Sequence, residues 1–270
     1  MKKLIKTVID YFLLSKTQIR IQSKTKSEVL QLIERLHPIK TDKSLVRLGP
    51  TDDGGYLVPD DLDGIEACIS PGVYAITDFE YHCLDRGMNL LLADKAIAEL
   101  NINASKDRYS FISKFIGVTN NKDFITLDTW VNQSNISKDG DLMLQMDIEG
   151  WEYFAFLNVS NELLKRFRVI IVEFHNLQNL WIPSFYAQAN AVFSKLFETH
   201  TCVHVHPNNY APIHTYDGVD IPPLAEFTFY RNDRVQNKGY AGTFPTPLDS
   251  DNVVNNPSIH LPKQWYRTSV

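Results

Sequence analysis

From residue 65 onward the sequence alternates between short apolar runs and amphipathic segments, and this alternation constrains the fold more than any other feature. Apolar runs of about four to eight residues are typical of strands buried on both faces of a parallel sheet, because helices then cover each face. The expected strands are residues 65–70, 89–93, 111–117, 141–147, 168–174, 201–206 and 224–230. The expected helices are residues 77–87, 95–103, 127–134, 150–166 and 184–199. The sequence therefore predicts an α/β fold with a mostly parallel, seven-stranded sheet.

The two ends of the chain differ from this alternating part. Residues 201–206 and 224–230 are joined without a helical pattern, which predicts an antiparallel strand at the edge of the sheet. Apolar residues at helical spacing predict N-terminal helices at residues 2–20 and 27–36. Paired glycines within residues 47–59 indicate a β-hairpin or a tight loop.

Composition and charge suggest three parts: a basic helical extension at residues 1–40, one α/β domain at residues 41–236, and an extended tail at residues 237–270. The first part holds nine Lys or Arg against three Asp or Glu, whereas the remainder holds 18 against 29. This acidic body argues against a nucleic-acid groove, which needs clustered Lys and Arg. The basic arm could contact a membrane face or a protein partner, although a solvated helix face is the commoner explanation.

The location of the protein is predicted from its cysteines and its hydropathy. Cys68, Cys83 and Cys202 are odd in number and far apart, as is typical of reduced thiols. No apolar run approaches the roughly 20 residues that a membrane span requires. We therefore expect a cytoplasmic protein whose basic arm could touch the inner face of the membrane. The oligomeric state is not predicted.

Polar residues cluster where the expected strands end. In an open parallel sheet, ligands bind beyond the carboxyl ends of the strands. The residues at or just after these ends are Gly72, Asp78, Glu80, Asp94, Asp147, Glu149, Glu173, His175, His204 and His206. We therefore expect a ligand site at this edge of the sheet.

Several of these residues also have a purely structural interpretation. A single glycine such as Gly72 serves any tight turn, and the three-glycine dinucleotide fingerprint is absent. Asp94 lies 22 residues later, a spacing that suits a carboxylate bound to ribose hydroxyls, and a helix N-cap is the alternative. Asp147 directly follows an apolar strand, which favours a functional role. Glu152 fits a structural role in the first turn of a helix.

Three kinds of chemistry could use such a site. Nucleotide hydrolysis is disfavoured, because the glycine-rich cradle and its Lys are missing. A metal-dependent hydrolase could use Asp147, Glu173, His175 and His206, although no HExxH-like spacing supports it. A transferase that binds an adenosine group needs a backbone bend, a ribose carboxylate and an apolar slot. The transferase fits these residues best.

A resemblance to a known family rests on several sequence segments in order. They are "DGGY" at 53–56, "SPGVYAITDFE" at 70–80, "FITLDTWV" at 124–131, "LMLQMDIEGWEYFAFLNVS" at 142–160, "VIIVEFHNL" at 169–177 and "PPLAEFTFYR" at 222–231. Together they span most of residues 45–232, and the D-x-E-G-x-E core is their most specific element. In these segments the chain resembles the FkbM-type S-adenosylmethionine-dependent methyltransferases. The resemblance implies a Rossmann-like methyltransferase fold and, as acceptor, a hydroxyl of a sugar or cell-surface glycan.

The resemblance also implies roles for individual residues. The expected cofactor-binding residues are Gly72, Val73, Asp78, Glu80, Asp94 and Asp147. The segment Ser-Pro-Gly-Val-Tyr is poorer in glycine than the usual first motif, which leaves the contacts near Tyr74 open.

Two hypotheses describe the methyl-transfer step. In one, His175 is the general base, and Asp147 or Glu173 orients it. In the other, the same three residues hold a divalent cation such as Mg²⁺ that lowers the pKa of the acceptor hydroxyl. A non-catalytic scaffold that binds cofactor or glycan without turnover is the alternative to an enzyme.

Overall fold

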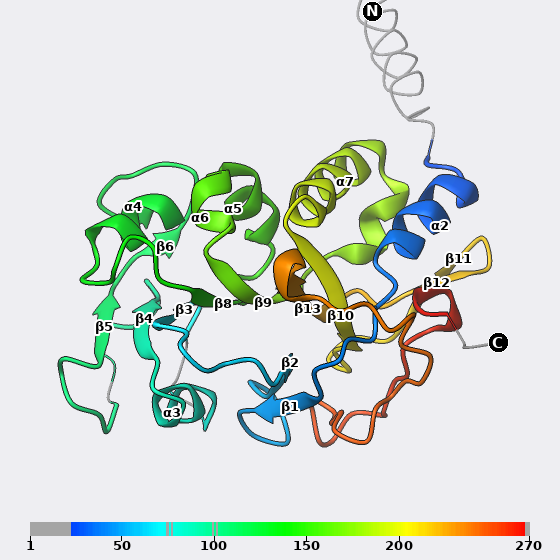
Figure 1. Ribbon diagram of the computed structural model, residues 1–270. Helices are drawn as coiled ribbons and strands as arrows, with labels where there is room; N and C mark the ends of the chain where they lie inside the picture. The colour runs from blue at the N-terminus through cyan, green and yellow to red at the C-terminus, as the bar shows by residue number, and fades with distance from the viewer. Residues whose placement is uncertain (1–22, 74–75, 77, 99, 101, 268–270) are drawn as a thin grey trace, which may run out of the picture.

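The computed structural model describes residues 23–73, 76, 78–98, 100 and 102–267. Its centre is one seven-stranded sheet with the strand order β10-β13-β9-β8-β3-β4-β5 (Figure 1). The strands are β3 (Ala67–Pro71), β4 (Asn89–Ala93), β5 (Tyr109–Ile112), β8 (Leu142–Met146), β9 (Phe167–Phe174), β10 (His200–Pro207) and β13 (Ala225–Arg231). Five neighbouring strands, from β9 to β5, are parallel. The predicted α/β class and mostly parallel seven-stranded sheet are confirmed.

The antiparallel strand does not lie at the edge, contrary to our prediction. β13 pairs antiparallel with both β9 and β10, and β10 is the outermost strand. Phe227 of β13 packs against Phe174 of β9 and Phe193, with ring centroids 5.6 and 6.2 Å apart. The position of β13 between β9 and β10 buries these rings. The order of the strands along the chain does not reveal this position.

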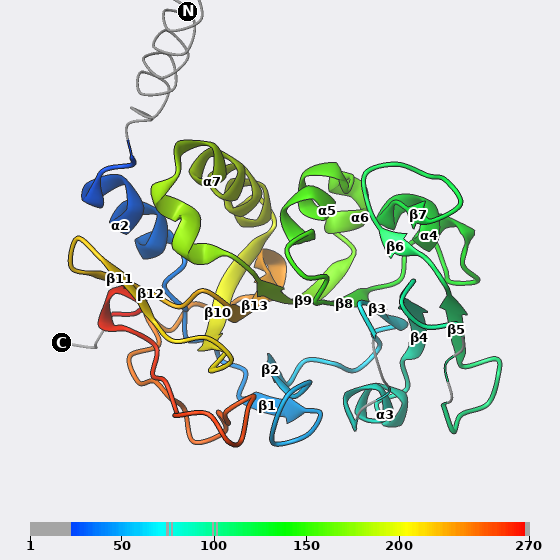
Figure 2. The same ribbon diagram turned by 180° about the vertical axis from the view of Figure 1, so that it is seen from behind.

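Helices cover one face of the sheet, and a mixed layer covers the other (Figures 1 and 2). The first layer consists of α2 (Lys26–Arg35), α4 (Leu127–Gln133), α5 (Glu152–Asn158), α6 (Asn161–Leu164) and α7 (Pro183–Phe197). The second layer contains α3 (Asp78–Asp85), the hairpin of β1 (Leu45–Leu48) and β2 (Tyr56–Pro59), and much of the C-terminal segment. Each layer buries its own apolar cluster against the sheet.

Shorter elements connect and extend this core. The strands β6 (Phe115–Ile116) and β7 (Phe124–Ile125) form a parallel pair, and β11 (His214–Tyr216) and β12 (Val219–Ile221) form a hairpin. Short 3₁₀ helices in the described part of the chain are η1 (Leu177–Trp181), η2 (Asn232–Arg234) and η3 (Lys263–Trp265). Among the described residues, no helix is long and apolar enough to cross a membrane.

Two predicted helices differ from the structure. No helix forms in the described part of residues 95–103, where the Asp94 carboxylate accepts a hydrogen bond from the Ala96 backbone N–H at 2.7 Å. Such a turn competes with helix formation. The predicted helix at residues 150–166 is divided into α5 and α6, because Ser160 caps a new helix by accepting from Leu163 N–H at 3.1 Å.

The remaining predicted elements can be compared directly. The predicted strand at residues 111–117 is two strands, β5 and β6. The predicted hairpin and the helix at residues 27–36 are found as β1–β2 and α2. The helix predicted at residues 2–20 lies outside the described residues.

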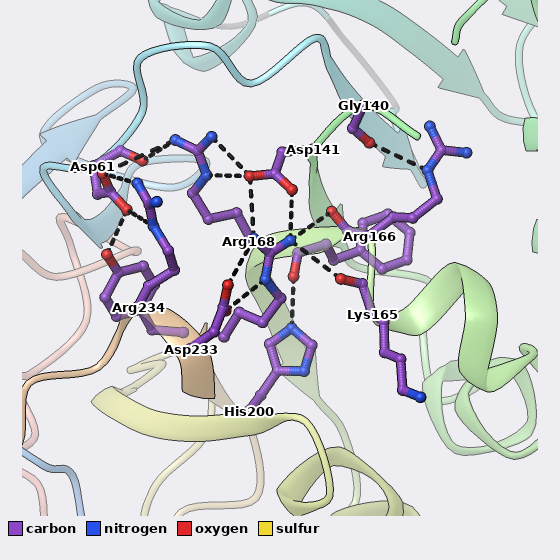
Figure 3. Close-up of polar contacts among 12 residues, drawn as sticks. Asp61, Gly140, Asp141, Lys165, Arg166, Arg168, His200, Asp233 and Arg234 are labelled. Carbon is purple, nitrogen blue, oxygen red and sulfur yellow. Dashed lines mark hydrogen bonds and ion pairs between the residues drawn. The ribbon is translucent and has the colours of Figure 1, made fainter. Parts of the chain in front are cut away.

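A network of arginines and aspartates lies at the amino ends of β8 and β9 (Figure 3). Arg168 and Arg231 both donate to Asp141, at 2.8 and 2.6 Å. Arg234 donates to both oxygens of Asp61, at 2.8 and 2.7 Å, and Arg168 donates to the Asp61 backbone carbonyl at 2.8 Å. This network joins β2, the sheet and η2 at the end of the sheet away from the candidate site.

Candidate functional site

A pocket of about 710 Å³ opens beyond the carboxyl ends of β3, β4 and β8. This volume is in the range of small-molecule sites, roughly 300–1,000 Å³. Five of the six residues predicted to bind a cofactor line the pocket: Gly72, Val73, Glu80, Asp94 and Asp147. The sixth, Asp78, is exposed at the start of α3 and is not among the described lining residues.

Gly72 joins the ends of two strands. Its φ is +89°, and a Cβ atom at this position would lie 1.6 Å from the Asp147 carbonyl oxygen. Only glycine fits this position, because any side chain would collide with the backbone after β8. The bend after β3 is therefore packed directly against the segment that carries Asp147.

Asp94 follows β4, the neighbour of β3 in the sheet. One carboxylate oxygen accepts from Ala96 N–H, which orients the side chain at the pocket. A carboxylate at the end of the strand next to the glycine bend is well placed to accept hydrogen bonds from paired ribose hydroxyls.

The aromatic wall of the pocket consists of Phe115, Phe124 and Trp151. Their ring centroids are 5.6 Å apart for Phe115 and Phe124, and 6.1 Å apart for Phe124 and Trp151. Phe115 and Trp151 are 45% and 47% exposed. Such flat apolar surfaces suit a planar ring such as a purine.

The loop from Asp147 to Glu152 turns sharply out of β8. Glu149 and Gly150 have φ values of +57° and +97°, an uncommon conformation for glutamate. Glu152 is fully buried, and its Oε1 accepts from the backbone N–H groups of Ile148 and Gly150, each at 3.0 Å. Glu152 thus has a structural role, as predicted, and the turn it stabilises directs Glu149 toward His175.

His175 follows β9 and lies among four carboxylates. Its Nε2 is 3.5 Å from Glu149 Oε2, 3.7 Å from Glu173 Oε1 and 3.8 Å from Asp147 Oδ1. Its Nδ1 is 3.2 Å from Glu152 Oε1. The residue is 8% exposed. The structure therefore brings together the three predicted catalytic residues, Asp147, Glu173 and His175, and adds Glu149.

The electrostatics of this group are strongly perturbed. Burial lowers the pKa of His175, but contacts with Glu152, Asp147 and Glu173 raise it more, to about 9. Burial raises the pKa of Asp147 to about 7, with further contributions from Glu152 and Glu149 and an opposing one from His175. Burial also raises the pKa of Glu173. In this arrangement His175 carries a proton at neutral pH, and the acids exceed the positive charge that faces them.

A row of buried polar side chains near the site was not predicted from the sequence. Ser70 donates to Gln145 at 2.7 Å, and Gln145 donates to the Tyr56 hydroxyl at 3.0 Å. Tyr56 and Gln145 both line the pocket. Gln145 stands two residues before Asp147 in an apolar strand, so strand alternation could have indicated that both face the same side.

His204 and His206 lie apart from this group. His204 Nε2 is 3.0 Å and His206 Nδ1 is 3.4 Å from Asp249 Oδ1, which belongs to the C-terminal segment. The ligand atoms found within 4.8 Å of one another in the described part of the chain come from Asp147, Glu149 and His175. The grouping of His206 with Asp147 considered for a hydrolase is therefore not seen.

A comparison with protein families gives a match that includes part of the candidate site. Residues 75–198, which include β8, β9 and the loop between Asp147 and Glu152, match the model of the methyltransferase FkbM domain family. No curated protein matches the chain. This segment of the chain therefore resembles the FkbM-type methyltransferases.

Proposed function

We propose that this protein is an S-adenosylmethionine-dependent O-methyltransferase that acts on a hydroxyl of a sugar or glycan. The observation that carries the proposal is the pocket, where the glycine bend after β3 and Asp94 after β4 meet Asp147 after β8. Part of this pocket belongs to the methyltransferase FkbM domain.

The pocket residues fit the methyl donor in three places. Asp94 keeps a carboxylate oxygen for ribose hydroxyls, since Ala96 N–H occupies only Oδ1. The wall of Phe115, Phe124 and Trp151 offers apolar faces for the purine. Gly72 and Val73 line the pocket beside Asp147, where the methionine part would lie.

The chain's own residues position and deprotonate the acceptor. The donor supplies a methyl group on a sulfonium, so the carbon is already activated. Asp147 and its neighbours His175 and Glu173 hold the acceptor hydroxyl behind this carbon, and the Asp147 carboxylate receives its proton as the O–C bond forms and the C–S bond breaks. Alignment of the two reactants contributes several kcal/mol of barrier lowering, of the order of 7 to 11 in the best intramolecular cases.

A sugar acceptor is supported by the resemblance and by the exposed aromatic residues at the pocket. The ring centroids of Trp151 and Phe154 are 5.3 Å apart, and Phe154 is 44% exposed. The aromatic surface therefore continues from the pocket onto α5. Aromatic faces of this kind stack on the C–H face of sugar rings. As part of the same proposal, we place the protein in the cytoplasm.

Calorimetry with S-adenosylmethionine and its demethylated product tests the donor site. We expect the wild type to bind both and Asp94→Asn to bind them about 10 to 100 times more weakly, because a charged hydrogen bond contributes about 1.5–3 kcal/mol. Asp78→Asn is the matched control, since Asp78 is an exposed acid outside the pocket, and we expect wild-type affinity. A folded wild type without affinity for the donor would refute the proposal.

Transfer of labelled methyl groups to a panel of sugars and glycans tests the acceptor. Methylation of a sugar hydroxyl is the expected result. Donor binding without turnover on any acceptor would favour a non-catalytic scaffold instead.

A further inference from the structure

We propose that Asp147, Glu149 and His175 form a binding site for one divalent metal cation. Each residue offers one ligand atom, and these atoms all lie within 4.8 Å of one another. The sequence predicted Asp147, Glu173 and His175 as ligands, so the structure assigns Glu149 to the position given there to Glu173.

The separations fit a shared ion. His175 Nε2 lies 3.5 Å from Glu149 Oε2 and 3.8 Å from Asp147 Oδ1. Ligand atoms about 2.1 Å from an octahedral ion are about 3 Å apart when they are adjacent. Glu149 is 87% exposed and can rotate, so a movement of its side chain closes the remaining distance.

The hydrogen bonding of His175 independently points to a ligand. The imidazole is nine-tenths buried, and its Nδ1 lies 3.2 Å from Glu152 Oε1. Its Nε2 faces Asp147 and Glu149, and no carboxylate oxygen of the described residues lies closer to it than 3.5 Å. Oδ1 of Asp147 is buried and without a hydrogen-bond partner among the described residues. Buried polar atoms in native proteins are nearly always paired, so an exception at a cluster of ligand atoms indicates a missing partner such as an ion.

Glu173 is less suited to be a ligand than Glu149. Asn208 Nδ2 lies 3.3 and 3.1 Å from the two carboxylate oxygens of Glu173 and donates to them, and the side chain is 6% exposed. Glu149 lines the pocket, is 87% exposed and lies 3.5 Å from His175 Nε2. The cation site thus opens toward the pocket and not into the protein interior.

Two carboxylate oxygens and one imidazole nitrogen suit a cation such as Mn²⁺, which accepts both kinds of ligand. Three protein ligands leave coordination positions for a further oxygen, as in catalytic metal sites. If the proposed function is correct, that oxygen is the acceptor hydroxyl, and the cation would lower its pKa. Cation binding itself does not depend on the proposed function.

Titration of the full-length, chelator-treated protein with Mn²⁺, with the free ion counted by electron paramagnetic resonance, tests the site. We expect one bound ion per chain in the wild type and none in Glu149→Gln or His175→Ala. Because Glu149 is exposed, its substitution should leave the fold intact. Glu162→Gln on the exposed surface of α6 is the matched control and should retain the ion.

Three results would overturn the cation site: no bound ion in the wild type, an ion that survives Glu149→Gln, or an ion lost in Glu162→Gln. Donor calorimetry on the same samples separates the two proposals. A wild type that binds Mn²⁺ but not S-adenosylmethionine retains the cation site and refutes the proposed function. A wild type that binds S-adenosylmethionine but not Mn²⁺ retains the proposed function and refutes the cation site.

Discussion

The acidic side chains at the two ends of the central strands lie in opposite electrostatic environments. At the amino ends of β8 and β9, Asp141 accepts from Arg168 and Arg231, and Asp61 accepts from Arg234 (Figure 3). At the carboxyl ends, four carboxylates face one imidazole, that of His175. The first end is matched in charge, whereas the second carries an excess of negative charge.

The pKa shifts follow this difference in sign. Burial raises the pKa of Asp141, but hydrogen bonds from Arg231 and Arg168 outweigh it, so the net pKa is lowered. The pKa of Asp61 is also lowered, because hydrogen bonds from Arg234 and Tyr230 outweigh the effect of burial. The pKa of Asp147, in contrast, is raised to about 7. Acids with raised pKa values are typical of functional sites, so one end stabilises the fold while the other retains unpaired charge for ligands.

Of the substitutions considered, Arg168→Met should change the free energy of unfolding most. It removes a buried cation that Asp141 and the Asp61 backbone carbonyl share, and loss of one member of a buried ion pair typically costs about 3–5 kcal/mol. We expect a decrease of that size in the free energy of unfolding, measured by urea denaturation, with unchanged donor affinity of the folded variant. A loss under about 1 kcal/mol, as for exposed pairs, would contradict the role given to this end.

Asp141→Asn should destabilise the protein by about 2 kcal/mol at neutral pH, because it loses charged hydrogen bonds. Since the folded pKa of Asp141 is lowered, its contribution is complete above the unfolded value of about 3.9 and disappears as pH falls through the folded value. Urea denaturation of both proteins from neutral pH to about pH 3 measures the difference. A difference that stays constant over this range is incompatible with the lowered pKa.

Asp147→Asn should change the free energy of unfolding in the opposite direction. The folded pKa of Asp147 is raised, so its carboxylate destabilises the folded state above the unfolded value, and most strongly above about pH 7. In chelator-treated protein at about pH 8, we expect stability to increase by about 1 kcal/mol while methyl transfer is lost. A less stable variant would show that Asp147 is satisfied within the fold.

Asp60→Asn should have the smallest effect. The ion pair between Arg86 and Asp60 is 2.9 Å long, but its side chains are 37% and 49% exposed. We expect a change under about 0.5 kcal/mol in the free energy of unfolding, because solvent screens such pairs. An effect as large as that of Arg168→Met would remove the distinction between buried and exposed pairs.

Much of the site could be predicted because parallel strands end at one edge of a sheet. Gly72, Asp94 and Asp147 each follow an apolar strand, and they line one pocket in the structure. Glu149 was seen in the motif but was given no role. Its direction depends on a left-handed backbone that Glu152 stabilises by accepting two backbone hydrogen bonds, and no local pattern reports such a contact.

The misplaced elements have equally specific reasons. The helix predicted at residues 95–103 was judged from apolar spacing, whereas the Asp94 side chain captures the Ala96 N–H and starts a turn. The contact of His204 and His206 with Asp249 joins residues more than 40 positions apart. Side-chain capture and long-range pairing both act through space, so periodicity cannot detect them.

The sequence by itself determined the α/β class, the positions of six of the seven strands of the sheet and the edge at which polar side chains gather. These features follow from hydrophobic periodicity, which is local. Only the tertiary structure decided that β13 lies inside the sheet, and that the side chain of Glu149 lies beside Asp147 and His175. Those outcomes depend on which buried rings pack together and which backbone groups a buried glutamate accepts from, and both are set by contacts between distant segments.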